Sequence, residues 1–303
     1  MSGEPLKLFC RKCHSKYDVS DMPPFSQFPC PECGTVLRTP QRFGKYLLEK
    51  ICARGGMSTI YRAIDPEKQA RVAVKIADIS GEFSEMQQRF SREIELMSNV
   101  VHSSVLQVYD AGVIGEQAFI VMEFMDGGDL ELHMKRKKLP PLPELTAHLR
   151  QVSCGLQYLF LNHGIVHHDV KPSNIMLNSE GNVKIGDFDL ADIRTTGNIT
   201  NPCPLWGSPG YLSPERLMYG GEDHRGDIYS LGITIYELFS GLTPFGIKGE
   251  TEELIERRKN PFTSLVELCP EAGEKISSLV DRMLCFDVEM RPPYPEIIRT
   301  LQL

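Results

Sequence analysis

The stretch that decides the fold of this chain reads HHDVKPSNIML over residues 167–177 and KIGDFD over residues 184–189. It places an aspartate, a lysine and an asparagine close together, at Asp169, Lys171 and Asn174. Carboxylate and amide oxygens are ligands for hard cations such as Mg²⁺, and a lysine ammonium can neutralise a phosphoryl group that is being transferred. The stretch therefore indicates phosphate chemistry assisted by a divalent cation.

The second half of this stretch predicts a β-hairpin. Two short apolar segments, 175–177 and 183–185, flank the turn NSEGN, and β-prone runs separated by turn residues are typical of hairpins. A hairpin here carries Asn174 and Asp187 to the same edge, where their oxygen atoms can hold one cation. Asp169 then remains free to orient or deprotonate a hydroxyl group.

These motifs resemble the catalytic loop and the metal-binding loop of eukaryotic-type protein kinases, H-R-D-x-K-P-x-N followed by D-F-G. Two positions depart from that pattern, because His168 replaces the usual arginine and Asp189 replaces the usual glycine. The resemblance implies a two-lobed α+β fold with a β-rich N-terminal lobe and a mainly helical C-terminal lobe. It also implies two catalytic residues, Asp169 and Lys171, and two Mg²⁺ ligands, Asn174 and Asp187.

The composition is typical of a soluble globular protein with one large or two small domains. The 303 residues are 41% hydrophobic and 24% charged, with a formal net charge of −7. This negative balance disfavours a protein that coats nucleic acid or an anionic membrane. The sequence has no run of about 18 apolar residues, and its first residues lack a secretory signal. We therefore expect a cytoplasmic protein without a membrane partner.

Four of the nine cysteines lie in the first 33 residues, as two C-x₂-C pairs. Each pair can present two thiolates from one tight turn, and four thiolates complete the tetrahedral shell of structural zinc. A module of about 42 residues rarely folds alone without a bound metal or a disulfide that stabilises it. The segment resembles a zinc ribbon, and the expected Zn²⁺ ligands are Cys10, Cys13, Cys30 and Cys33.

Three other interpretations of these cysteines exist. The string CRKCH over residues 10–14 also matches a haem-attachment motif, but that motif leaves the second pair without a role. A thioredoxin-like redox pair requires a βαβ context that the surrounding sequence lacks. The third interpretation is four unrelated buried cysteines. The zinc ribbon is preferred because it accounts for both pairs.

Charge argues against nucleic acid as the partner of the ribbon. Residues 1–42 hold six basic and four acidic side chains, which gives a balance of +2. A zinc ion with four thiolates adds about −2, so the sum is near zero and too small for phosphate-driven binding. We therefore expect a structural role or a protein partner for the ribbon.

The segment before the catalytic stretch resembles the ATP-binding half of a protein kinase. The turn ARGGMS spans residues 53–58, and backbone N–H groups in such a turn can contact phosphates. A generic hairpin turn is an equal interpretation of these six residues alone. The strand that ends in Lys75 matches the family's third strand, whose lysine contacts the α- and β-phosphates of ATP. Residues 83–101 have helical spacing, and the resemblance implies that Glu93 on this helix pairs with Lys75.

The run FIVM over residues 119–122 predicts a buried strand, which leads into a hinge at residues 123–128. In the family, the residue before the hinge lies behind the adenine ring, and hinge backbone groups bind its polar edge. Ala53 and Ser58 stand where the family's turn motif has glycine. The resemblance implies an ATP site of twelve residues: Ala53, Gly55, Gly56, Ile60, Ala73, Lys75, Glu93, Met122, Glu123, Met125, Asp129 and Met176.

Three further residues match structural positions of the family. The sequence GSPGYLSPE over 207–215 resembles the end of an activation segment, and its last residue, Glu215, is expected to pair with Arg291. Breaking a buried pair of this kind by removing one partner costs several kcal/mol. Asp227 opens an apolar helix and corresponds to the family's aspartate that braces the catalytic-loop backbone.

The irregular stretch 191–209 resembles an activation segment, and in most kinases the arginine before the catalytic aspartate helps to bind a phosphate on it. His168 is shorter and, near a reference pKa of about 6.5, is mostly neutral at pH 7. The sequence therefore predicts that activity depends only weakly on phosphorylation of this segment. Its candidate hydroxyl-bearing residues are Thr195, Thr196 and Thr200.

We therefore predict a zinc ribbon at residues 1–42 and a protein kinase domain, most similar to bacterial members, at residues 43–303. Its N-lobe ends at about residue 122 and its C-lobe begins at residue 129. The predicted function is ATP- and Mg²⁺-dependent transfer of the γ-phosphoryl group to Ser or Thr hydroxyls of protein substrates, because Lys171 and Pro172 match the Ser/Thr form of the loop.

Two alternatives belong to other functional classes. The first is a pseudokinase that acts as a nucleotide-binding scaffold or sensor, which is favoured by four departures from the family pattern, at Ala53, Ser58, His168 and Asp189. The second is a zinc-ribbon nucleic-acid adaptor, which the charge of the ribbon disfavours.

Overall fold

The computed structural model describes residues 5–55, 58–79, 85–193, 207–246 and 249–302, without the side chains of residues 85–89. The chain forms two compact units. The first comprises residues 1–88 and 108–124, and the second comprises residues 89–107 and 125–303. Several predicted positions lie outside the described residues: Gly56, Thr195, Thr196 and Thr200.

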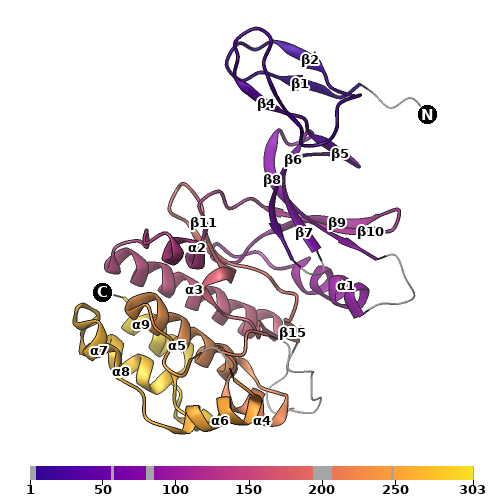
Figure 1. The fold of residues 1–303 in the computed structure, drawn as a ribbon. Coiled ribbons are helices and arrows are strands. Elements are labelled where there is room, and N and C mark those ends of the chain that lie inside the picture. Colours follow the sequence, from indigo (N-terminus) through magenta and orange to yellow (C-terminus); the bar gives the residue numbers. More distant parts are fainter. Residues whose placement is uncertain (1–4, 56–57, 80–84, 194–206, 247–248, 303) are drawn as a thin grey trace. The chain divides into compact units, whose positions relative to one another are not determined.

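Four short strands at the start of the first unit form two antiparallel hairpins (Figure 1). β1 (Lys7–Phe9) pairs with β2 (Lys16–Asp18), and β3 (Gln27–Pro29) pairs with β4 (Val36–Arg38). Each pair of cysteines occupies the turn of one hairpin. The two hairpins bury few apolar side chains, since Leu37 is the one large aliphatic residue among the three buried members of their core cluster.

The two cysteine turns have nearly the same backbone structure. The N–H of Cys10 donates to the carbonyl of Ser15 at 2.9 Å, and the N–H of Cys30 donates to that of Thr35 at 2.7 Å. A residue with positive φ follows each pair, and in the second turn this residue is Gly34, at 72°. Glycine adopts this conformation without steric cost, so the sequence C-x₂-C-G fits the turn directly.

The rest of the first unit is a six-stranded antiparallel sheet in the order β5-β6-β7-β8-β10-β9 (Figure 1). Register shifts in β6 opposite β7 mark irregular pairing that bends the strand. The strands are β5 (Gln41–Phe43), β6 (Tyr46–Arg54), β7 (Ser58–Asp65), β8 (Ala70–Asp78), β9 (Val108–Ile114) and β10 (Gln117–Glu123).

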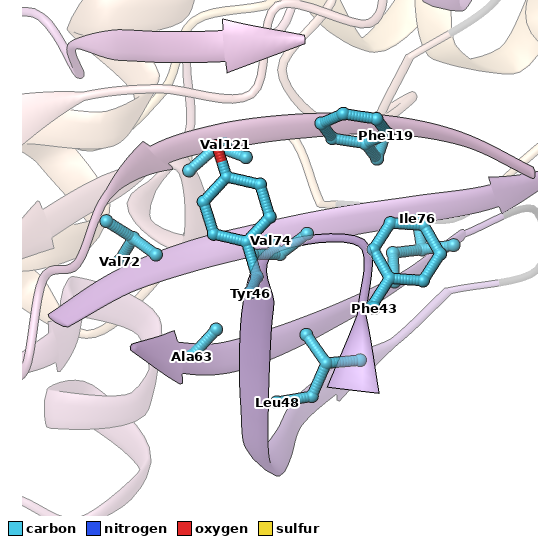
Figure 2. Packing of buried hydrophobic residues seen from close by; sticks show 9 residues of the cluster. All are labelled: Phe43, Tyr46, Leu48, Ala63, Val72, Val74, Ile76, Phe119 and Val121. Atoms are coloured by element: carbon cyan, nitrogen blue, oxygen red, sulfur yellow. The ribbon is translucent and has the colours of Figure 1, made fainter. Parts of the chain in front are cut away.

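One apolar cluster fills the core of this sheet (Figure 2). The ring of Phe119 lies edge-on to that of Phe43, with centroids 5.6 Å apart, and a second edge contact joins it to Tyr46 at 6.2 Å. Aromatic pairs in this geometry stabilise a core beyond their buried area. The labelled members are Phe43, Tyr46, Leu48, Ala63, Val72, Val74, Ile76, Phe119 and Val121.

The hairpins also contact the sheet within this first unit. Phe25, which follows β2, stacks on Tyr61 of β7 with ring centroids 5.9 Å apart. Arg11 lies 3.3 Å from Glu49 of β6, and Glu49 in turn lies 2.7 Å from Arg62 of β7. The cysteine hairpins therefore pack on β6 and β7, the strands that flank the glycine-bearing turn.

The second unit is mainly helical (Figure 1). Its long helices bury apolar stripes, and in α3 this stripe comprises Leu145, Leu149, Val152, Leu156 and Leu159, all of them buried. No helix of the described residues is long and apolar enough to span a membrane. The helices are α1 (Glu85–Met97, shared with the first unit), α2 (Leu130–Lys135), α3 (Leu142–His163), α4 (Pro214–Tyr219), α5 (His224–Ser240), α6 (Thr251–Lys259), α7 (Leu265–Leu268), α8 (Gly273–Met283) and α9 (Tyr294–Thr300).

Short strands of the second unit carry the catalytic stretch. β13 (Ile175–Leu177) and β14 (Val183–Ile185) form the predicted hairpin, which is confirmed, and β11 (Gly128–Asp129) pairs with β13. β12 (Ile165–Val166) pairs with β15 (Asp192–Ile193).

The predicted helix over residues 83–101 is shorter than expected. α1 ends at Met97, and Val101 is 70% exposed beyond the helix end. The apolar spacing therefore placed Val101 on the buried stripe wrongly, because the helix stops before its turn reaches the core.

Candidate active site

The side chain of Asp169 lies in the loop after β12 and is only 8% exposed. Its Oδ2 atom accepts hydrogen bonds from Lys171 Nζ at 2.7 Å and from Asn174 Nδ2 at 3.1 Å. Its Oδ1 atom has no hydrogen-bond partner among the described residues. Lys171 Nζ also donates to Ser208 Oγ at 2.9 Å. The loop therefore fixes one carboxylate oxygen and leaves the other buried without a hydrogen-bond partner among the described residues.

Asp227 fixes the backbone of this loop through two hydrogen bonds. The N–H groups of His167 and His168 donate to its two carboxylate oxygens at 2.7 and 2.8 Å. Burial raises the pKa of Asp227 to about 6, while the charge of His168 and the two N–H groups oppose that rise. These bonds support His168 in a left-handed backbone conformation, with φ of 65°, which is uncommon for a residue with a side chain.

His167 links this loop to the hairpin that follows. Burial lowers its pKa to about 4, so the ring is neutral at pH 7. Its Nδ1 accepts the N–H of Asp169 at 3.3 Å, and its Nε2 lies 3.1 Å from the carbonyl of Gly186. Because a neutral ring has one donor, Nε2 carries the proton. The catalytic loop and the residue before Asp187 are therefore held together.

The hairpin brings Asn174 and Asp187 to one edge. Ile175 pairs with Ile185, and the N–H of Gly186 donates to the carbonyl of Asn174 at 3.0 Å. A Cβ at Gly186 would lie 2.5 Å from Met176 Cε, so a side chain there would displace Met176. Asn174 commits its Nδ2 to Asp169, so its Oδ1 is the atom suited to a cation.

Three carboxylates gather near this edge. Glu93 of α1, Asp187 and Asp189 each offer one oxygen, and these atoms lie within 4.8 Å of one another. Such a set fits a hard divalent cation. Left-handed backbone occurs at Asp187, with φ of 65°, and Asp189 is not among the described residues with positive φ. Strain from a positive φ therefore does not arise at Asp189, where the family has glycine.

The first unit positions the predicted phosphate-binding residues by sheet register. Lys75 of β8 is 4% exposed and lies opposite Ile60 in β7, which in turn lies opposite Ala53 in β6. Gly55 closes the turn between these strands by donating its N–H to Ser58 at 2.8 Å. The pairing of Lys75 with Glu93 stays a prediction.

Five other residues predicted for the ATP site occupy defined positions in their own units. In the first unit, Ala73 lies opposite Met122 in β10, where Met122 is 8% exposed. In the second unit, Met125 is equally buried, and Asp129 in β11 lies opposite Met176 in β13.

Asp129 has a further role in the fold. Its Oδ1 accepts the N–H of Leu132 at 2.8 Å and so caps the N-terminus of α2. Capping by an aspartate typically contributes about 1 kcal/mol. Glu123, the last residue of β10, lies opposite Val72.

Glu215 and Arg291 form a bidentate ion pair, with Arg291 Nη1 and Nη2 each donating to one carboxylate oxygen at 2.7 Å. Arg291 also donates to the carbonyls of Cys285 and Arg225. Fork-to-fork geometry with additional hydrogen bonds is the arrangement that compensates best for burying two charges. The pair ties the start of α4 to the segment before α9.

The four cysteines of the hairpins form the second group of metal-ligating side chains. Their sulfur atoms lie within 4.8 Å of one another, with Cys10–Cys33 and Cys13–Cys30 both 3.5 Å apart. Zn–S bonds of about 2.3 Å in a tetrahedron require sulfur separations of about 3.8 Å. Burial opposes ionisation of Cys30, but a hydrogen bond with Tyr17 lowers its pKa to about 6. The donor set therefore fits zinc.

The surroundings of His168 could not be predicted from the sequence. This histidine contacts Glu222, which lies 54 positions further along the chain. Glu222 belongs to no motif that spacing alone identifies, and its proximity to the catalytic loop depends on the fold of the second unit.

The chain matches the family model described as "Protein kinase domain" over residues 46–301. It therefore belongs to the protein kinase family. Of the curated relatives, the chain is 38% identical over 204 residues to the serine/threonine-protein kinase PknL of Mycobacterium tuberculosis, which covers 66% of this chain and 50% of that protein. It is 33% identical over 240 residues to PrkC of Bacillus subtilis, with 78% and 37% covered.

A third relative is the probable serine/threonine-protein kinase pknA2 of Bifidobacterium longum, with 30% identity over 255 residues and 82% of this chain covered. The chain spans about half the length of the first of these relatives, and less of the other two.

Proposed function

We propose that this protein is an ATP-dependent serine/threonine protein kinase. The observation that carries the proposal is the state of Asp169, whose Oδ2 is held by Lys171 and Asn174 while its Oδ1 has no hydrogen-bond partner among the described residues. An oriented carboxylate with one oxygen available is suited to bind a substrate hydroxyl and to accept its proton. The names of the relatives, all serine/threonine kinases, support the same substrate class.

The chain's own residues divide the work of phosphoryl transfer. Asp169 orients the acceptor hydroxyl and takes its proton as the new P–O bond forms. Lys171, 2.7 Å from Asp169, neutralises charge on the phosphoryl group during transfer. Lys75 contacts the phosphates that remain with ADP. Bound Mg²⁺ would supply charge neutralisation on the phosphate oxygens, and Asn174 and Asp187 would hold it.

The contact between Lys171 and Ser208 supports hydroxyl substrates of the Ser/Thr type. The Ser208 hydroxyl lies 2.9 Å from Lys171 Nζ, and the same Nζ donates to Asp169 Oδ2. Lys171 therefore bridges the serine hydroxyl and the catalytic carboxylate. A serine or threonine side chain is short, and a substrate serine of similar reach fits beside these two groups. The acceptor is therefore a Ser or Thr side chain of a protein.

We further propose that residues 1–42 are a zinc ribbon with Zn²⁺ on the four cysteine thiolates, and that residues 43–303 are the kinase domain, working in the cytoplasm. The sulfur positions support the metal. Since the ribbon's charge is near zero, its partner is a protein surface rather than nucleic acid.

The test is labelling with ATP and Mg²⁺ on a generic basic protein. Wild type transfers phosphate to Ser or Thr, and Asp169→Asn and Lys75→Met each lose at least about a hundredfold in rate, which is about 2.7 kcal/mol. Asp21→Asn, an exposed aspartate of the ribbon, is the matched control and keeps full activity. Equal labelling by Asp169→Asn contradicts the assignment of the catalytic residue. A wild type that binds ATP without transferring phosphate is a pseudokinase.

A further inference from the structure

The carboxylate of Glu222 is buried beside the catalytic loop and has no role in the chemistry described above. Its Oε1 lies 2.8 Å from Nδ1 of His168, and both side chains are at most 2% exposed. Its Oε2 accepts a hydrogen bond from Ser213 Oγ. Arg216, also buried, places Nη1 3.7 Å from Oε1. One carboxylate therefore contacts the catalytic loop and both ends of a short stretch at the start of α4.

Glu222 is a charged group in these surroundings. Burial disfavours its ionised form, but the hydrogen bond and charge of His168, together with the charge of Arg216, lower its pKa overall. Removing one member of a buried ion pair leaves the other charge uncompensated. Among the described residues Arg216 Nη1 lies in an ion pair with Glu222 without a hydrogen bond to it. The carboxylate thus faces the buried charge of the arginine as well as His168.

The chain makes room for this carboxylate at one glycine. A Cβ at Gly226 would lie 1.9 Å from Glu222 Oε2 and 2.2 Å from its Cδ. Gly226 lies in the first turn of α5, where alanine would favour the helix more than glycine does. Its neighbour Asp227 holds the backbone of the same catalytic loop. Residues 222–227 therefore bring two carboxylates to the loop, one for its backbone and one for its side chain.

We propose that Glu222 is a positioning residue for phosphoryl transfer, which fixes the catalytic loop through His168 and ties it to the start of α4 through Ser213 and Arg216. This proposal rests on the proposed kinase function. His168 precedes Asp169 and holds a left-handed backbone with φ of 65°, a conformation that persists only when its surroundings fix it. Misplacement of a catalytic group by about 1 Å costs on the order of a hundredfold in rate.

The first test replaces the charge and keeps the shape, as Glu222→Gln. Phosphate transfer is measured per ATP-binding site, so that loss of folded protein is not counted as loss of catalysis. We expect kcat to fall at least about tenfold with KM for ATP within about twofold. Glu289→Gln is the matched control, because Glu289 forms an ion pair with Arg225 but its side chain is 73% exposed. This change should leave both kcat and KM for ATP unchanged.

The second test displaces the carboxylate and keeps its charge, as Gly226→Ala. The added Cβ pushes Glu222 away from His168, while the helix itself gains. We expect kcat to fall as much as in Glu222→Gln, while the variant still binds one ATP per chain and is therefore folded. This variant decides the question if Glu222→Gln does not fold. In the double variant His168→Gln with Glu222→Gln, the loss should not exceed that of either single change, because both act on one contact.

A third measurement does not depend on activity. Amide exchange over residues 165–170 should accelerate in either variant, since the loop loses a support, whereas exchange in α3 stays unchanged. An inactive wild type contradicts the proposed function alone, and this exchange then decides the positioning role. Wild-type kcat in Gly226→Ala, or unchanged loop exchange in both variants, overturns the proposal.

Discussion

The two clusters of side chains with the chemistry to hold a metal ion are built in opposite ways. The four cysteines come from two short hairpins with nearly the same turn, and within each pair the ligands are three residues apart. The carboxylates of Glu93, Asp187 and Asp189 come from a helix and from a loop almost a hundred residues later. The first group is assembled by local structure, and the second exists only once the helical unit has folded.

This difference has consequences for stability. The cysteine hairpins bury little apolar area, so metal binding must supply much of their folding free energy. The carboxylates lie on a unit with a large buried core, which folds without them. Removal of metal should therefore unfold the cysteine hairpins, whereas at the carboxylates it should abolish activity without unfolding the helical unit.

The largest expected effect is on the ribbon. Cys30→Ser removes one of the four proposed zinc ligands and with it most of the roughly 10–16 kcal/mol that structural zinc contributes to such modules. We expect residues 1–42 to lose protection in hydrogen exchange while α3 and α5 keep theirs. Cys52→Ser, an exposed cysteine of β6, is the control. Metal analysis should give one zinc per wild-type chain, and its absence from fresh reduced protein contradicts the site.

The next effect is on the carboxylate group. Asp187→Asn should lower kcat at least about a hundredfold, about 2.7 kcal/mol in the barrier. The side chain is exposed and asparagine tolerates its positive φ. The thermal midpoint should therefore stay within about 2 °C of wild type. A large loss of stability would show that this aspartate is structural and would remove the contrast between the two sites.

A smaller effect measures how strongly the ribbon is coupled to the sheet. Phe25→Ala removes the stacking contact with Tyr61, and we expect about 1–2 kcal/mol of destabilisation in the thermal transition of the sheet. Phe9→Ala changes a ring that is 57% exposed and serves as the control. Identical midpoints for both variants would mean that the ribbon and the sheet are stabilised independently.

The smallest effect is expected at Asp189. Since its backbone does not have positive φ, Asp189→Gly should relieve little strain, and activity should stay within a few-fold, below about 1 kcal/mol. The Mg²⁺ concentration for half-maximal rate should not change. A shift in that concentration, or in the preference for Mn²⁺, would show that Asp189 binds the cation. An inactive wild type restored by this change would identify a pseudokinase.

The sequence could predict elements whose signals are local. The hairpin of β13 and β14, the apolar stripe of α3 and the paired cysteine turns depend on residues within a few positions of each other. Kinase membership followed from motifs in order, and the family match over residues 46–301 confirms it. The helix end near Val101 was wrong because the apolar spacing continues past the point where the helix stops.

The amino-acid sequence by itself determined the protein family, the paired cysteine turns and the hairpin that brings Asn174 and Asp187 to one edge, because turn chemistry and apolar periodicity act over short distances. Only the tertiary structure decided that Glu222 meets His168 across 54 positions, that Gly226 leaves the space for it, and that the left-handed residue of the metal loop is Asp187. These features depend on burial, which makes an ion pair or a missing Cβ matter, and burial is set by packing between distant segments.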